Sequence, residues 1–192
     1  MKGQSKSEGL GPGVYYAREA YATLLTRCII VAVDFGVVLF GGAILQAACY
    51  EFTPQGHDPA RWFLGSWVAT AYVYLVFIEA SSIGTLGMIL TGMKIVNLNG
   101  ERPSFLRMTF RLLLWGIGPF HPVIDFVWLS NDADRQTLRD KLAGTYVVRR
   151  DAIPRGIGVV RLRQYFLLGL AILFPEVRRE EPSARVATDA IS

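Results

Sequence analysis

Residues 28–50 read CIIVAVDFGVVLFGGAILQAACY, an apolar stretch whose single charged residue is Asp34. At 23 residues it exceeds the ~20 that an α-helix needs to cross the hydrocarbon core of a bilayer. A cleaved signal peptide is the alternative, but its apolar region is uncharged and only about 7 to 15 residues long. The stretch therefore predicts a transmembrane helix.

The composition of the whole chain agrees with a membrane protein. Of its 192 residues, 52% are hydrophobic and 19% are charged, and the mean hydropathy is +0.32. Soluble domains carry about 25% charged residues, more than this chain does. The composition also excludes a disordered chain and a coiled coil. The net charge is +4, but no arginine cluster is interleaved with aromatic residues. We therefore expect the lipid bilayer, and not a nucleic acid, as a partner.

Two further apolar stretches follow the first. Residues 62–80 are long enough to span, whereas residues 105–130 are interrupted by GIGPFHP at 116–122. Two prolines and two glycines within seven residues do not continue a straight helix. We expect two short helices, 105–117 and 122–130, in a hairpin that enters and leaves on one side of the membrane. A single crossing is the alternative.

The distribution of Lys and Arg predicts the orientation. Only Arg61 lies between the first two apolar stretches, whereas the other 19 basic residues lie elsewhere. Positively charged loops remain in the cytoplasm, so the N-terminus is expected there. The hairpin keeps the arginine-rich segment after residue 130 on the same side. It also allows the two predicted strands, 93–98 and 144–149, to pair.

The predicted fold is thus an all-α integral membrane bundle with two full transmembrane helices, a broken third segment and a small cytoplasmic two-stranded β element. Residues 1–17, rich in glycine, are expected to be a flexible tail. The apolar stretch 165–174 is too short to span and follows Arg161 and Arg163. We therefore expect residues 157–174 to form an amphipathic helix at the membrane surface.

Several charged residues are expected to form a buried polar cluster. Arg27 and Asp34 are seven positions apart and lie on one helix face. Inserting an aspartate into a transmembrane helix costs a free energy of roughly 2.5 to 3.5 kcal/mol. Asp34 must therefore face other parts of the protein and have a partner there. Arg111 is the predicted partner, because the hairpin places it at a similar depth. A purely structural ion pair and a proton or ion relay both remain open. The supporting members of the cluster are expected to be Glu79, Arg107, Arg111 and Asp125.

No enzymatic or cofactor motif is present in the sequence. His121 and Asp125 are four positions apart, but two ligands do not make a zinc site, which needs three or four. We expect neither catalysis, nor a cofactor, nor a bound metal.

Arg27, Asp34 and the run RQTLRDKLAGTYVV at residues 135–148 together resemble the RDD family of bacterial membrane proteins, which is named for one arginine and two aspartates. The resemblance covers roughly residues 18–150 and makes Asp140 the third signature residue. It departs at Ile83, Gly84 and Met88, where the family has Gly, Gln and Lys. We predict that Arg27 and Asp140 meet at the inner membrane surface.

The resemblance implies a multi-pass protein of the bacterial inner membrane. It points to transport of a small solute or cation, since sodium/proton exchange is reported for some members. Arg27, Asp34 and Asp140 would then form the relay. Three short membrane segments enclose little space, so a homo-oligomer or a membrane-protein partner is expected. The alternative is a membrane scaffold that transports nothing and whose charged residues are structural.

Overall fold

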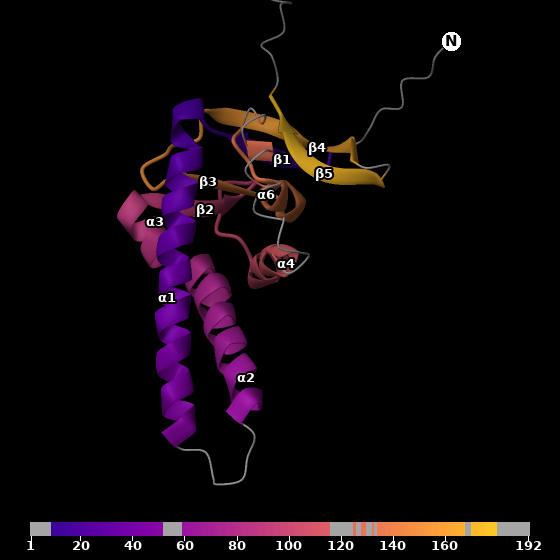
Figure 1. Cartoon of the computed structure of the whole chain (residues 1–192). Coiled ribbons are helices and arrows are strands. Elements are labelled where there is room, and N and C mark those ends of the chain that lie inside the picture. The colour runs from indigo at the N-terminus through magenta and orange to yellow at the C-terminus, as the bar shows by residue number, and fades with distance from the viewer. Residues whose placement is uncertain are drawn as a thin grey trace, which may run out of the picture.

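The computed structural model describes residues 9–51, 59–115, 125, 128–129, 132, 134–167 and 170–179. The helix α1 (Leu24–Glu51) runs beside α2 (Pro59–Tyr72), and two small sheets gather near the N-terminal end of α1 (Figure 1). Gly42 lets the two helices approach closely, because a Cβ there would lie 2.9 Å from the Trp67 ring. The long helix is therefore anchored at one end in a β-rich region and packs along its length on α2.

The predicted first span corresponds to α1, which is long and apolar enough to cross a membrane. Within the described residues it is the one helix that meets both conditions. The predicted second span, 62–80, is helical throughout, with α2 continuing into a π-helical segment, η2 (Val73–Ile78). Its apolar part, Phe63–Ile78, is shorter than a full span.

The predicted strand pair is confirmed. Strand β2 (Met93–Asn97) pairs antiparallel with β3 (Thr145–Arg149), with Met93 opposite Arg149 and Asn97 opposite Thr145. The Ala22 amide donates to the Val147 carbonyl at 2.9 Å. The segment that leads into α1 is thereby tied to this sheet.

The prediction of an all-α bundle was wrong, because a second sheet exists. It has the order β1–β4–β5, with β1 (Pro12–Tyr15), β4 (Gly156–Leu167) and β5 (Leu170–Arg178) all antiparallel. Residues 157–167 and 170–174 therefore lie in two paired strands instead of an interfacial helix, and part of the expected N-terminal tail is a strand. The sequence IGVVRLRQY at 157–165 alternates and is rich in β-branched residues, which favours a strand.

The remaining helices are short. They are the 3-10 turn η1 (Arg18–Ala20), α3 (Leu86–Thr91), α4 (Phe105–Trp115) and α6 (Leu138–Ala143). The helix α4 covers the first half of the predicted hairpin. The Gly/Pro break at 116–122, with His121, lies outside the described residues, as does most of the second half.

Two apolar cores support these elements. One lies between α1, η2, α3, α4 and the β2–β3 sheet, and it includes Ile30, Val76, Met88, Met108 and Val147. The other lies between the two sheets around Tyr16, Tyr21 and Tyr146, whose rings meet edge to face. The charged residues described next border the first core.

Candidate functional site

Asp140 lies in the first turn of α6, and its side chain has no solvent exposure. Thr137 and Asp140 form a capping box, in which each backbone amide donates to the side chain of the other at 3.2 Å. A capping box satisfies two amides that a helix start would otherwise leave unpaired. The carboxylate of Asp140 is thus fixed in place by its own helix.

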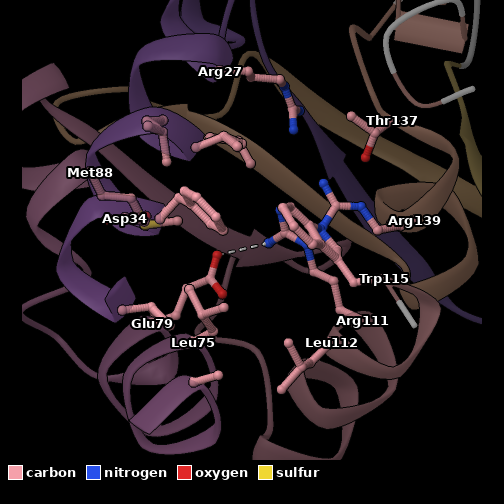
Figure 2. A pocket seen from close by; sticks show the side chains of 16 residues that line it. Arg27, Asp34, Leu75, Glu79, Met88, Arg111, Leu112, Trp115, Thr137 and Arg139 are labelled. Atoms are coloured by element: carbon pink, nitrogen blue, oxygen red, sulfur yellow. Dashed lines mark hydrogen bonds and ion pairs between the residues drawn. The ribbon is translucent and has the colours of Figure 1, made fainter. Parts of the chain in front are cut away.

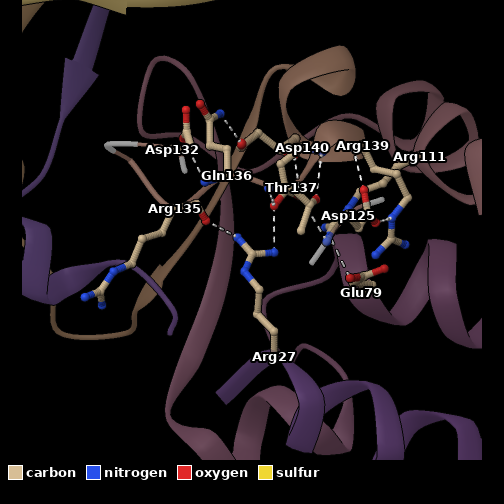
Figure 3. Close-up of polar contacts among 11 residues, drawn as sticks. Arg27, Glu79, Arg111, Asp125, Asp132, Arg135, Gln136, Thr137, Arg139 and Asp140 are labelled. Atoms are coloured by element: carbon tan, nitrogen blue, oxygen red, sulfur yellow. Dashed lines mark hydrogen bonds and ion pairs between the residues drawn. The ribbon is translucent and has the colours of Figure 1, made fainter. Parts of the chain in front are cut away.

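Two arginines from other helices bind this carboxylate (Figure 3). Arg27 from α1 places Nη1 2.6 Å from Oδ2, and Arg111 from α4 places Nη2 3.1 Å from Oδ1. Arg27 also donates from Nη2 to the Arg135 carbonyl at 2.9 Å. The predicted meeting of Arg27 and Asp140 is confirmed. Through the two arginines, Asp140 joins α1 and α4 to the start of α6.

The charges around Asp140 decide its protonation. Burial by itself raises the pKa of a carboxyl group, but the nearby positive charges of Arg27, Arg111 and Arg139 outweigh it and lower the pKa of Asp140 well below its usual range. Asp140 is therefore ionised at every physiological pH. This favours a structural role for it over proton exchange.

Two further carboxylates extend the network. Glu79, directly after η2, accepts from Arg111 Nη1 at 3.3 Å. Asp125 is 2% exposed and forms an ion pair with Arg139, whose backbone amide also donates to it at 3.3 Å. The predicted residues Glu79, Arg111 and Asp125 thus do belong to one cluster. Arg139 was not predicted, although it lies in the quoted run at 135–148.

Arg107 does not contact these carboxylates. Its Nη1 donates to the carbonyls of Ala143 and Gly144, at 3.4 and 3.2 Å, where α6 ends. A cation at this end of a helix satisfies carbonyls that lack a partner in the helix. Arg107 therefore stabilises α6 from outside the cluster.

Asp34 contradicts the predicted pairing with Arg111 (Figure 2). Both Nη groups of Arg111 bind Asp140 and Glu79, as given above. The Asp34 carboxylate instead accepts from the Tyr74 hydroxyl at 2.9 Å, the Thr85 hydroxyl at 2.7 Å and the Gly87 amide at 2.9 Å. Among the described residues it forms no ion pair.

This arrangement depends on a close approach between α1 and α3. A Cβ added to Gly87 would lie 2.7 Å from the Ile30 carbonyl and 2.9 Å from Asp34 Oδ1. Only a residue without a side chain lets its amide reach the carboxylate here. Thr85 and Gly87 were not among the residues predicted to contact Asp34.

Asp34 and the network around Asp140 face a common pocket of about 280 Å³. Its charged end includes Arg27, Glu79, Arg111 and Arg139, and Thr137 contributes a hydroxyl (Figure 2). The rest of the lining is apolar and comes from α1, α2, η2, α3, α4 and β3, at Ile30, Val31, Phe35, Val38, Ala71, Leu75, Met88, Leu112, Trp115 and Val147. In the part of the chain that the structure describes, no group of three His, Cys, Asp or Glu side chains could hold a metal ion.

Comparison with known proteins gives a family match. The model of the RDD family matches residues 17–144, two thirds of the chain, and this range includes Arg27, Asp34 and Asp140. Strands β1, β3, β4 and β5 lie outside the matched range. Neither curated proteins nor solved structures gave a significant match.

Proposed function

The chain belongs to the RDD family, and we propose that it is a multi-pass protein of the bacterial inner membrane that exchanges a small cation, such as sodium, for a proton at Asp34. The N-terminus and both sheets would lie in the cytoplasm. A homo-oligomer, or a complex with another membrane protein, would complete the path across the membrane.

The exposed surface of the helices supports this placement. Many large apolar side chains of α1 and α2 are exposed, among them Phe40, Ile44 and Leu64 at 67% to 76%. So much exposed apolar surface indicates contact with lipid or protein. The arginine-rich segment that includes α6 and β3 lies at the sheet end of the molecule (Figure 1). An excess of Lys and Arg is typical of the cytoplasmic side.

The observation that carries the proposal is the environment of Asp34. This carboxylate is 5% exposed and is held by two hydroxyls and one amide, all neutral. A buried carboxylate whose donors are all neutral lacks a positive counter-charge, which a proton or a small cation would supply. Asp34 also lines the pocket, which gives such an ion a place to bind.

The test is ion exchange in proteoliposomes that contain the purified protein and a pH-sensitive dye. Addition of sodium, potassium or lithium salts should release protons from the lumen with at least one of them. Asp34→Asn should abolish exchange and leave the circular dichroism spectrum unchanged. Asp151→Asn, at an exposed residue of the same type, should exchange ions like the wild type. Exchange that persists in Asp34→Asn, or wild-type vesicles inactive toward all three cations, would refute the proposal.

A membrane scaffold is the second candidate, and the closed pairing at Asp140 favours it. Arginines from two different helices bind both oxygens of Asp140, and such an arrangement holds the helices together. A scaffold predicts wild-type vesicles without exchange and variants at Arg27 or Asp140 that lose assembly instead of transport.

A further inference from the structure

The pocket has a charged end and an apolar end, arranged along α1. Arg27 lies at the charged end, whereas Phe35 and Val38 line the pocket eight and eleven residues later. At 1.5 Å per residue this is roughly 12 to 17 Å further along the helix, toward its middle. In a membrane the charged end would therefore lie at head-group level and the apolar end among the acyl chains.

Two hydrogen-bond donors at the charged end have no partner within the described residues. They are the Nε atoms of Arg27 and Arg111, whose residues are only 6% and 7% exposed. Both side chains line the pocket (Figure 2). A buried donor without an acceptor is unfavourable, so these atoms indicate a ligand that carries an acceptor.

The charges that line the pocket favour an anion as this acceptor. Three guanidinium groups line it, namely those of Arg27, Arg111 and Arg139. Asp140 and Asp125, which form ion pairs with them, do not line it. The two acidic residues that do are Glu79 and Asp34, and their carboxylates are engaged by Arg111 and by neutral donors.

We infer that the pocket binds one anionic amphiphile from the inner leaflet, with a carboxylate or phosphate head against Arg27 and Arg111 and an acyl chain against Phe35, Val38 and Leu75. The inference rests on the membrane placement proposed above but not on ion exchange. A pocket of about 280 Å³ is near the lower end of ligand-sized cavities, so it would hold the head and the first part of the chain.

Trp115 lines the pocket and reports its occupation, because bromine atoms quench tryptophan fluorescence on contact. The full-length protein is placed in phosphatidylcholine nanodiscs and titrated with 9,10-dibromostearate. The difference between the wild type and Trp115→Phe isolates the signal of Trp115. We expect saturable quenching by the fatty acid, and binding of its uncharged methyl ester at least about tenfold weaker.

Two alanines on α2 provide a matched pair of variants. Ala71→Leu fills the pocket and should abolish the saturable quenching, whereas Ala69→Leu, at an exposed position outside the pocket, should leave it unchanged. Equal quenching by acid and methyl ester, or unchanged binding in Ala71→Leu with a native circular dichroism spectrum, would overturn the inference.

A further titration distinguishes the sources of the anion. Tighter binding of dibrominated phosphatidate than of the fatty acid would assign the site to a phospholipid, and the reverse order to a free fatty acid. If an equal concentration of inorganic phosphate displaced the fatty acid or the phosphatidate, the proposed role of the acyl chain would be overturned. If the wild type exchanges cations but binds neither amphiphile, this inference is refuted and the proposed function stands. If it binds an amphiphile but exchanges no cation, the proposed function is refuted and this inference stands.

Discussion

Asp140 and Asp34 are both buried beside the same pocket, but different chemistry stabilises them. Asp140 lies between two guanidinium groups from α1 and α4. Asp34 accepts three hydrogen bonds from neutral groups of η2, α3 and the residue before α3. A carboxylate between arginines remains ionised and holds helices together, whereas one among neutral donors has no positively charged partner. The comparison separates a structural signature residue from a candidate functional one.

The largest expected effect is the loss of the charge at Asp140. Asp140→Asn leaves the buried Arg27 without its counter-charge and Arg111 with Glu79 alone, which should destabilise the protein by roughly 3 to 5 kcal/mol. Thermal unfolding in detergent measures this loss. Asp34→Asn should be milder, because an amide oxygen can still accept hydrogen bonds. Equal losses at the two positions would contradict the distinction between them.

The stability that Asp140 contributes should depend on pH. The folded-state pKa of Asp140 lies below its unfolded value near 3.8, so the unfolded chain binds the proton more readily. The stabilisation is therefore fully present above about pH 4 and is lost as the pH falls through the folded-state pKa. Unfolding midpoints measured from pH 5 down to pH 2 should fall in the wild type and in Asp34→Asn. In Asp140→Asn, the part of this decline of the midpoint that is due to Asp140 should be absent. A parallel decline of the midpoint in all three proteins would contradict this prediction.

A double-mutant cycle tests with which aspartate Arg111 forms an ion pair. Arg111→Met and Asp140→Asn should couple by about 1 to 3 kcal/mol, because each removes a partner of the other. Arg111→Met and Asp34→Asn should be additive to within about 0.5 kcal/mol. Unfolding midpoints of the single and double variants provide the values. Coupling with Asp34 that is as strong as with Asp140 would reinstate the pairing that the structure contradicts.

The smallest expected effect concerns the packing that presents the Gly87 amide to Asp34. Gly87→Ala places a Cβ 2.7 Å from the Ile30 carbonyl and should destabilise the protein by about 1 to 3 kcal/mol. Gly36→Ala in α1 meets nothing within 4 Å and should be neutral or stabilising by up to about 1 kcal/mol. Thermal midpoints of the two variants make the comparison. If the Asp34 donors matter for transport, Gly87→Ala should also slow cation exchange.

Local patterns in the sequence were sufficient for part of this site. The apolar length of residues 28–50 predicts α1, and the predicted strands 93–98 and 144–149 pair as β2 and β3. The family resemblance identified Arg27 and Asp140, and their ion pair follows from the shared membrane side of the two segments. Each of these inferences needs only periodicity, charge and topology.

Periodicity failed where a segment was both short and apolar. The stretch 165–174 fits an interfacial helix by length and composition, but most of it lies in the β4–β5 hairpin. The alternation of Arg161, Leu162 and Arg163 was the available signal for a strand. Short apolar stretches fit helices and strands equally well, and the pairing of β4 with β5, in a sheet that also includes β1, makes this one a pair of strands.

The sequence by itself determined the apolar helix, the strand pair beside it and the need for a partner at each buried charge. Only the tertiary structure decided which partner each charge has. Arg111 and Asp34 were predicted to lie at a similar depth in the membrane, but depth says nothing of the direction in which a side chain points. The close packing of α3 on α1 at Gly87 provides neutral donors to Asp34, and the capping box of α6 turns Asp140 toward both arginines. These are contacts between residues 29 to 113 positions apart, and their geometry is set by packing, which no local pattern encodes.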